Sequence, residues 1–409
     1  MLQLVDIGVQ SIDAYSEVIG KEGVDELRQL AEPLKGKRIA HISSTPYGGG
    51  VSELLRSTVP LQVDLGLDIE WQVMYGDESF FGVTKAIHNL LQGAEGTLSE
   101  RAREIYLAYS ARNAMLLERD YDYVVVHDPQ PAALLQLHGQ NGAKWVWRCH
   151  IDTSRRNQEV WQFLRGFVEE YNAAVFTMKE FVPDDIDIPQ VTLIAPAIDP
   201  LSPKNLPLPS ELAWRILDWI GVDIDRPLVT QVSRFDPWKD PLGVIDAYKM
   251  VRRRIPGLQL ALVGSMALDD PEGWGIYNKI VEASKDDPGI RLYTNLNGVG
   301  NVEVNAFQRF SSVVIQKSIR EGFGLVVAES LWKSTPVVAR RVGGIPQQMA
   351  DGEGGFLVDT VEETADRVLQ LLEDPRAAAE IGARGQRRIA ENFLITRLIK
   401  DELQLLASL

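Results

Sequence analysis

The sequence alternates short, continuous apolar runs with helical stretches, and this alternation limits the chain to one class of fold. Continuous apolar strands are buried on both faces, which is typical of a parallel sheet covered by helices. We therefore predict an α/β fold of two Rossmann-like domains whose parallel sheets face each other across a cleft. The predicted strands are Arg38–Ser43, Ile69–Tyr75, Tyr123–Val126, Trp145–His150, Ala174–Thr177 and Val191–Ile194 in the first domain, and Leu228–Ser233, Leu258–Val263, Ile290–Tyr293, Ser312–Ile315, Pro336–Ala339 and Gly355–Val358 in the second.

A proline-rich segment, Asp199–Pro209, separates the two groups of strands. Its prolines at 200, 203, 207 and 209 forbid regular structure and stiffen the connection. We place the linker at residues 199–209, between a first domain at 36–198 and a second domain at 210–390.

The two ends of the chain lie outside these domains. Residues 1–35 form an appended segment that either covers an edge of the first domain or contributes to a subunit contact, so a homodimer is compatible with the sequence. Residues 391–409 contain an amphipathic helix, Ile395–Leu406, which we expect to pack back on the first domain.

The composition excludes several classes of function. The 409 residues carry a net charge of −15, whereas nucleic acids and anionic membranes require a basic face. The single cysteine, Cys149, excludes an internal disulfide. Residues 1–6 lack the basic start and apolar block of a signal peptide, and no apolar run reaches the length of a membrane span. We expect a cytoplasmic protein with small-molecule partners and no nucleic-acid or membrane partner.

The stretch Lys317–Glu329 joins a buried strand to a helix through a glycine-containing turn. Such a turn presents free backbone N–H groups and the positive end of a helix dipole to a ligand. Gly322 and Gly324 allow the backbone to approach that ligand closely. Glu321 and Glu329 could then contact different parts of one extended polar ligand. Taken alone, the turn fits a tight connection with two solvated glutamates better.

A pair of cations, Arg234 and Lys239, follows the first strand of the second domain. They precede a helix that opens near Pro241, and two cations beside a helix N-terminus suit a diphosphate. The alternative is two surface cations on a loop, which we favour less in an acidic chain.

A run of three glycines, Gly48, Gly49 and Gly50, follows the strand Arg38–Ser43 and opens a helix at Val51. The run is not a Gly-x-Gly-x-x-Gly motif, and no Walker lysine follows it. It is either a flexible loop tip or backbone close to a ligand. We favour the ligand, because the loop lies at the carboxyl end of a parallel strand.

His150 ends a predicted strand at the edge of the sheet where sites form. A lone histidine beside an apolar strand is nevertheless more often a packed core residue. Asp128 also follows a strand, and it is equally well explained as a partner of a substrate hydroxyl or as a helix cap before Pro129. Further candidates near these loops are Tyr47, Asp77 and Asp152, whereas structural roles are expected for His41, His88 and His138.

Asp-x-Asp pairs occur at three places, each in a polar loop or before a strand and without a histidine cluster. We interpret them as surface acids and predict no metal site and no required cofactor. They are Asp120/Asp122, Asp185/Asp187 and Asp223/Asp225.

Glu321 and Glu329, with Gly322-Phe323-Gly324 between them, resemble the signature of retaining glycosyltransferases of the GT-B kind, the relatives of glycogen synthase and sucrose synthase. Arg234 and Lys239 resemble that group's diphosphate-binding pair, and Val342–Pro346 resembles its loop after the donor site. Three strings together look like the trehalose synthase branch, which includes trehalose glycosyltransferring synthase and retaining trehalose phosphorylase. The strings are Thr45–Val51, Trp147–Asp152 and Gln316–Leu325.

The resemblance implies transfer of a glucosyl group from UDP-, ADP- or GDP-glucose to glucose, giving trehalose with retained configuration and in a reaction that can be reversible. It implies four catalytic residues: His150, Arg234, Lys239 and Glu321. The implied donor-binding residues are Gly48, Gly49, Gly50, Arg234, Lys239, Glu321, Gly322, Phe323, Gly324, Leu325 and Glu329. The acceptor-binding candidates are Tyr47, Asp77, Asp128, His150 and Asp152.

Three alternatives remain open at this point. A trehalose phosphorylase would use the same arginine and lysine to hold inorganic phosphate. A related enzyme could use another acceptor, as in sucrose or glycan synthesis. A non-catalytic nucleotide-sugar-binding protein would not need all of the implied catalytic residues.

Overall fold

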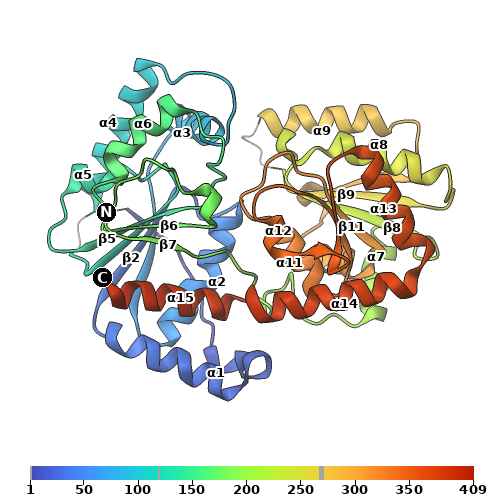
Figure 1. Cartoon of the computed structure of the whole chain (residues 1–409), viewed down its shortest axis with the longest axis horizontal. Helices are drawn as coiled ribbons and strands as arrows, with labels where there is room; N and C mark the ends of the chain where they lie inside the picture. The colour runs from blue at the N-terminus through green and yellow to red at the C-terminus, as the bar shows by residue number, and fades with distance from the viewer. Residues whose placement is uncertain (1, 118–119, 267–270) are drawn as a thin grey trace. The chain divides into compact units, whose positions relative to one another are not determined.

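The structure, a computed structural model, describes residues 2–117, 120–266 and 271–409. The chain forms two compact units, the first made of Met1–Pro196 with Ile395–Leu409 and the second of Ala197–Leu394. Each unit contains a seven-stranded sheet with helices on both faces (Figure 1), which confirms two Rossmann-like α/β domains. No helix within the described ranges is long and apolar enough to cross a membrane.

The first sheet has the strand order β1-β3-β2-β4-β5-β6-β7. All neighbouring strands are parallel except β1, which pairs antiparallel with β3. The appended N-terminal segment therefore covers the β3 edge of the sheet. The strands are β1 (Gln3–Leu4), β2 (Arg38–Ser43), β3 (Asp68–Val73), β4 (Tyr123–His127), β5 (Lys144–Cys149), β6 (Ala173–Phe176) and β7 (Val191–Leu193).

Helices cover both faces of the first sheet. One face packs against α3 (Glu78–Leu91), α4 (Glu100–Leu116), α5 (Leu134–His138) and α6 (Gln158–Val168). On the other side α15 (Ile395–Ser408) packs on α1 (Ser16–Ala31) and α2 (Gly50–Asp64). In Figure 1, α15 is the red helix that lies beside α2. Its apolar side is buried, since Leu398, Ile399 and Leu403 have no exposed surface.

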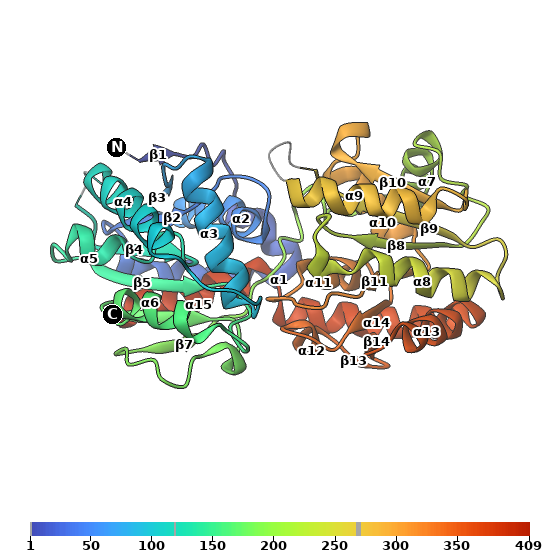
Figure 2. The same cartoon turned by 90° about the horizontal axis from the view of Figure 1, so that it is seen from above.

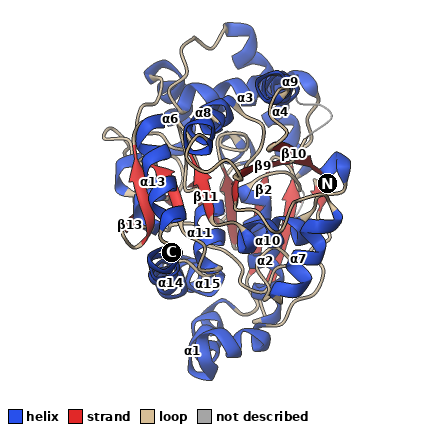
Figure 3. Cartoon of the chain, turned by 90° about the vertical axis from the view of Figure 1, so that its right-hand side faces the viewer, coloured by secondary structure: helices blue, strands red, loops and turns tan. Residues whose placement is uncertain are grey.

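The second sheet has the strand order β10-β9-β8-β11-β12-β14-β13, with every pair parallel. The strands are β8 (Leu228–Val232), β9 (Gln259–Gly264), β10 (Ile290–Thr294), β11 (Val313–Gln316), β12 (Val337–Arg340), β13 (Ala350–Asp351) and β14 (Gly354–Val358). The helices are α7 (Ser210–Trp219), α8 (Pro241–Arg252), α9 (Pro271–Ser284), α10 (Asn301–Phe310), α11 (Leu325–Trp332), α12 (Ile345–Gln348), α13 (Val361–Glu373) and α14 (Pro375–Asn392). Figure 2 shows α8 and α9 side by side over this sheet, and Figure 3 shows the strands in red between helices in blue.

The chain passes between the units twice, after Pro196 and after Leu394. In the first unit, the guanidinium of Arg397 donates hydrogen bonds to the backbone oxygens of Ala195 (2.7 Å) and Pro196 (3.1 Å). In the second unit, the Ile198 amide donates to the Phe393 oxygen (2.9 Å). In each unit, hydrogen bonds therefore connect the two segments of chain that lead to the other unit.

The residues predicted as a linker, 199–209, belong to the second unit. Asn305 of α10 donates hydrogen bonds to the backbone oxygens of Pro203 (3.1 Å) and Leu206 (2.9 Å). Because the prolines prevent a helix or strand here, these carbonyl oxygens have no partner from regular structure, and Asn305 of α10 donates to them instead. The passage between the units thus precedes the prolines instead of coinciding with them.

Inside each sheet, away from the edge strands β1 and β13, strand order reverses between β2 and β4 in the first and between β8 and β11 in the second. Open α/β sheets bind ligands outside the carboxyl ends of the strands at such a point. The loop after β8 carries Arg234 and Lys239, and the loop after β11 carries Glu321. The fold therefore places the predicted donor-site residues where this architecture forms sites.

Candidate active site

Glu321 lies at the centre of the candidate site in the second unit and is 9% exposed. Its Oε2 atom accepts hydrogen bonds from Lys239 Nζ (2.6 Å), Ser318 Oγ (3.0 Å) and Gln316 Nε2 (3.1 Å). No hydrogen bond from another described residue reaches its Oε1 atom. The structure thus joins two residues predicted from separate loops, Lys239 and Glu321, and leaves one carboxylate oxygen for a substrate hydroxyl.

The surroundings of Glu321 keep its carboxyl ionised. Burial alone would raise the pKa of this group, but the charge of Lys239 and three hydrogen bonds outweigh burial and lower the pKa. An ionised carboxylate accepts strong hydrogen bonds from hydroxyl groups. Glu321 is therefore suited to orient a sugar.

Glycines bring a second loop against the backbone of Glu321. A Cβ atom on Gly343 would lie 1.6 Å from the Glu321 carbonyl oxygen, and Gly343 has a φ of +54°. The Gly344 amide donates a hydrogen bond to the Gly322 oxygen (3.1 Å). The loop Val342–Pro346 therefore fixes the turn that carries Glu321, and its glycines leave room for that contact.

An ion pair between the buried Lys317 and the half-buried Asp240 joins the loops after β11 and β8. Asp240 also caps α8 by accepting a hydrogen bond from the Gly243 amide (3.1 Å). Sequence reasoning missed this pair, although an aspartate directly before a proline is a signal for a helix start. It also missed Gln316 and Ser318 as partners of the glutamate.

Arg234 is placed differently from Lys239. Its side chain is 56% exposed and its guanidinium lies 3.4 Å from an Asp236 oxygen. The structure thus does not pair Arg234 with Glu321. A guanidinium held at the carboxyl end of β8 with this much exposure has donors to offer to a phosphate.

Glu329, the second glutamate of the pattern, is 2% exposed on α11. It accepts a hydrogen bond from Gln308 Nε2 (2.9 Å) and lies 3.4 Å from Lys204 Nζ. Burial raises the pKa of its carboxyl, but Lys204 and Lys333 outweigh that effect and the pKa is lowered. Glu329 therefore anchors the proline-rich segment to α11, and its predicted ribose contact remains a prediction.

His150 follows β5 in the first unit, and two of its contacts are with residues that end or follow β4. Its Nε2 lies 3.0 Å from Nδ1 of His127, and its backbone amide donates to Oδ1 of Asp128 (2.7 Å). Asp128 has a φ of +67° and accepts this bond instead of capping a helix. Burial raises the pKa of Asp128 to about 7, although the hydrogen bond from His150 and the charge of Arg148 oppose the shift.

We expect the substitution Asp128→Asn to stabilise the protein at pH 8 more than at pH 4. The folded-state pKa of about 7 lies above the ordinary 3.8, so the folded protein holds this proton more tightly than the unfolded chain does. The resulting stability is complete below about pH 4 and is lost as the pH rises toward 7. Asparagine keeps the accepting oxygen, tolerates positive φ and does not ionise.

Urea denaturation of both proteins from pH 4 to pH 8 checks this prediction, since the difference between them cancels the titration of other groups. A difference in stability that does not change with pH would contradict it.

The remaining predicted residues of the first unit lie in loops at the carboxyl ends of its strands. Asp77 caps α3 through the amides of Ser79 and Phe80, and hydrogen bonds from the hydroxyls of Ser79 and Tyr109, together with those from the two amides, lower its pKa to about 2. Tyr47 is 71% exposed with Arg56 over its ring. Asp152 is buried and accepts from the Ser154 amide (3.0 Å). Open space surrounds the Cβ positions of Gly48 and Gly49, so packing does not require these glycines, but Gly48 has a φ of +78°, which favours glycine.

Comparison with known families matches both halves of the chain. The family "Trehalose synthase, N-terminal domain" matches residues 41–183, and "Glycosyl transferases group 1" matches residues 218–388. A trehalose synthase of Rubrobacter xylanophilus is 51% identical, with 100% of this chain and 99% of the relative aligned. A trehalose synthase of Pyrococcus horikoshii is 46% identical over 98% of this chain and 97% of its own.

A more distant relative is a trehalose phosphorylase of Pleurotus pulmonarius. It is 28% identical over 85% of this chain, but the match covers only 54% of the phosphorylase.

Solved structures share the fold at low sequence identity. A sucrose-phosphate synthase from Thermosynechococcus elongatus superimposes with a TM-score of 0.69 at 17% identity and covers 90% of this chain and 98% of its own. An Escherichia coli structure described as trehalose-6-phosphate bound with UDP-2-fluoro glucose gives 0.73 at 13% identity, with 91% and 99% covered. Both support the GT-B assignment of the two α/β domains.

Proposed function

This chain belongs to the trehalose synthase family of glycosyltransferases, and on that premise we propose that it transfers glucose from a nucleotide-diphosphate glucose to a second glucose. The product is trehalose, with retained configuration at the donor carbon. The observation that carries the proposal is the Glu321–Lys239 pair, which lies at the carboxyl ends of β11 and β8, where strand order reverses. An ionised sugar-orienting carboxylate beside a cation is what a diphosphate-linked sugar requires.

The proposed chemistry is a displacement on one face of the sugar. The bond between the donor C1 and the phosphate oxygen breaks, and a bond from the acceptor oxygen to C1 forms on the same face. The acceptor proton passes to the leaving phosphate. Lys239 and Arg234 stabilise the charge that develops on that phosphate. Glu321 orients the donor sugar, together with the backbone amides of residues 322–324.

A double displacement would instead need a carboxylate beneath the donor C1. We assign no carboxylate to that position. The leaving phosphate is therefore the base in this proposal.

Trehalose phosphorolysis is the second candidate, and the phosphorylase relative supports it. That relative extends over nearly twice the matched length, whereas the synthase relatives match along their whole length. The synthase reaction is therefore the one we propose.

Product analysis by sugar chromatography tests the proposal. The protein would be incubated with glucose and UDP-, ADP- or GDP-glucose, and separately with trehalose and phosphate. Trehalose in the first set is the expected result, and it identifies the nucleobase. Glucose 1-phosphate formed only in the second set would move the assignment to phosphorolysis. No product in either set would mean another acceptor or a protein that only binds.

Arg234→Ala is expected to lower kcat about a hundredfold, because it removes a charge that stabilises the leaving phosphate. Arg226→Ala is a matched control, since Arg226 lies just before the amino end of β8 and pairs with Asp223 at 3.8 Å. Steady-state kinetics of both variants would measure the effect. An unchanged kcat in Arg234→Ala would contradict the role of Arg234.

A further inference from the structure

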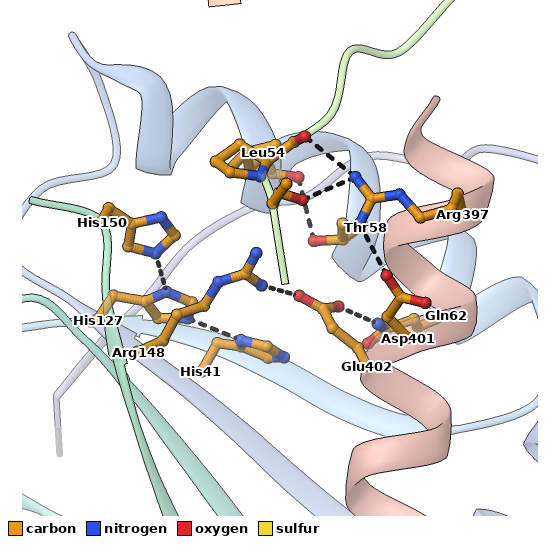
Figure 4. A network of polar contacts seen from close by, with 12 residues as sticks. His41, Leu54, Thr58, Gln62, His127, Arg148, His150, Arg397, Asp401 and Glu402 are labelled. Atoms are coloured by element: carbon orange, nitrogen blue, oxygen red, sulfur yellow. Dashed lines mark hydrogen bonds and ion pairs between the residues drawn. The ribbon is translucent and has the colours of Figure 1, made fainter. Parts of the chain in front are cut away.

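Three histidines form a line in the first unit: the buried His41 of β2 and His127 of β4, and the half-buried His150 directly after β5 (Figure 4). Nδ1 of His41 lies 2.9 Å from Nε2 of His127, and Nδ1 of His127 lies 3.0 Å from Nε2 of His150. The rings stack at centroid distances of 5.2 and 5.3 Å. In both contacts, Nδ1 of one ring therefore faces Nε2 of the next ring in the direction of His150.

The register of the sheet produces this line. His41 of β2 pairs with Val125 of β4, and His127 pairs with Arg148 of β5. Side chains two residues apart lie on the same face of a strand. His127 therefore lies two residues closer to the carboxyl end of its strand than the partner of His41, and His150 lies two residues beyond the partner of His127. The line thus runs from the middle of the sheet to His150 at the carboxyl ends of the strands.

The inner end of the line meets unpaired polar atoms. Nε2 of His41 and Nη2 of Arg148 are buried and have no hydrogen-bond partner among the described residues. Both residues border a cavity of about 20 Å³, which is room for one water molecule. Glu402 also borders it, but its two oxygens already accept bonds from Arg148 Nη1 and from Gln62 Nε2 (2.8 Å).

We propose that His127 and His41 are positioning residues that hold His150 in the tautomer with its proton on Nδ1. The role at a sugar site rests on the function proposed above. A neutral imidazole has one donor and one acceptor nitrogen, so the line is protonated either on every Nδ1 or on every Nε2. The unpaired Arg148 group in the cavity is a donor. His41 and Arg148 make no direct hydrogen bond, so one water in the shared cavity would accept from Arg148 and donate to His41 Nε2, which places the proton of His41 on Nδ1.

The order of donors and acceptors then follows along the line. His41 donates to His127, His127 donates to His150, and His150 keeps an N–H at Nδ1, away from His127. Burial, together with the charge of Arg148, lowers the pKa of all three histidines, so the rings stay neutral. His150 thus offers a neutral donor to a sugar oxygen at the carboxyl end of β5.

The imidazole ¹⁵N spectrum of histidine-labelled protein tests the tautomer without any substrate. The chain has five histidines, and pyrrole-type and pyridine-type nitrogens have distinct shifts. Variants at each histidine assign the signals. We expect His150 to carry its proton on Nδ1 and to be unprotonated at Nε2. A proton on Nε2 of His150 would overturn the proposal.

Two variants of His41 separate positioning from packing. His41→Gln retains an N–H that can donate to His127, whereas His41→Met fills similar volume without a hydrogen bond. We expect His41→Met to mix the two tautomers of His150 and to lower kcat about tenfold, with His41→Gln close to the parent protein. His138→Gln is the control, because His138 lies outside the line.

The proposal fails if His41→Met leaves both the His150 spectrum and kcat unchanged. The spectra need no substrate. If the protein forms no trehalose, the proposed reaction is therefore wrong, but the spectra still test the tautomer of His150.

Discussion

Glu321→Gln is expected to lower kcat/KM by about a hundred- to a thousandfold while the protein stays folded. The substitution keeps the shape of the side chain but removes the charge that faces Lys239 at 2.6 Å. It also replaces one accepting oxygen by an NH₂ group, which cannot accept a hydrogen bond from a sugar hydroxyl. Either the contacts to Ser318 and Gln316 or the contact to the sugar is then lost. Steady-state kinetics over a range of donor concentrations would measure this effect.

Glu380→Gln is a suitable control, since Glu380 lies on α14 of the same unit and is 62% exposed. Lys239→Met adds a second test. The two site residues act as a pair, so the double variant should lose much less than the product of the two single losses. A Glu321→Gln enzyme within tenfold of the parent would exclude Glu321 from the reaction.

Glu402→Leu is expected to lower the free energy of unfolding of the first unit by about 3–5 kcal/mol. The side chains of Glu402 and Arg148 are 10% and 5% exposed, so removing the carboxylate leaves a buried guanidinium without its counter-charge. Burial raises the pKa of Glu402, and the charge of Arg148 and the Gln62 hydrogen bond oppose that shift. Urea denaturation at neutral pH would measure the loss.

The double variant Arg148→Met/Glu402→Leu should recover most of this stability, because a buried ion pair is often replaceable by apolar groups of similar volume. Asp401→Ala provides the neighbouring control on α15. Its partner Arg397 is 24% exposed and Asp401 is 32% exposed, so its loss should cost under about 1 kcal/mol. A Glu402→Leu protein as stable as the control would contradict the argument.

The regular part of the fold was predictable because each strand has a local pattern. β4 and β5 are continuous apolar runs, and the amphipathic pattern of Ile395–Leu406 extends as α15 to Ser408. The strand β1 was not predicted, since two residues carry no period. The proline-rich segment was predicted to connect the domains, but the structure assigns it to the second unit. Its hydrogen bonds to α10 join residues about a hundred positions apart, and no local pattern records them.

The candidate site was predictable residue by residue but not as a network. Glu321 and Lys239 each stood out from their own loop, whereas their hydrogen bond depends on the pairing of β8 with β11. His41 was assigned a structural role because a lone histidine in an apolar strand is usually packed. Its alignment with His127 and His150 is set by the register of three strands, which the sequence alone does not specify.

The assignment of α15 to the first unit has a consequence for biosynthesis. The second unit is one continuous stretch of chain, whereas the first needs a helix that the ribosome makes after the whole of the second. Nascent chains generally complete domains from the N-terminus onward. Here the order is reversed: until residues 395–409 emerge, Arg148 has no counter-charge and the surface that α15 covers stays open. A fragment that ends at Pro196 would remain in that state. A chain that also carried residues 395–409 would contain every part of the first unit.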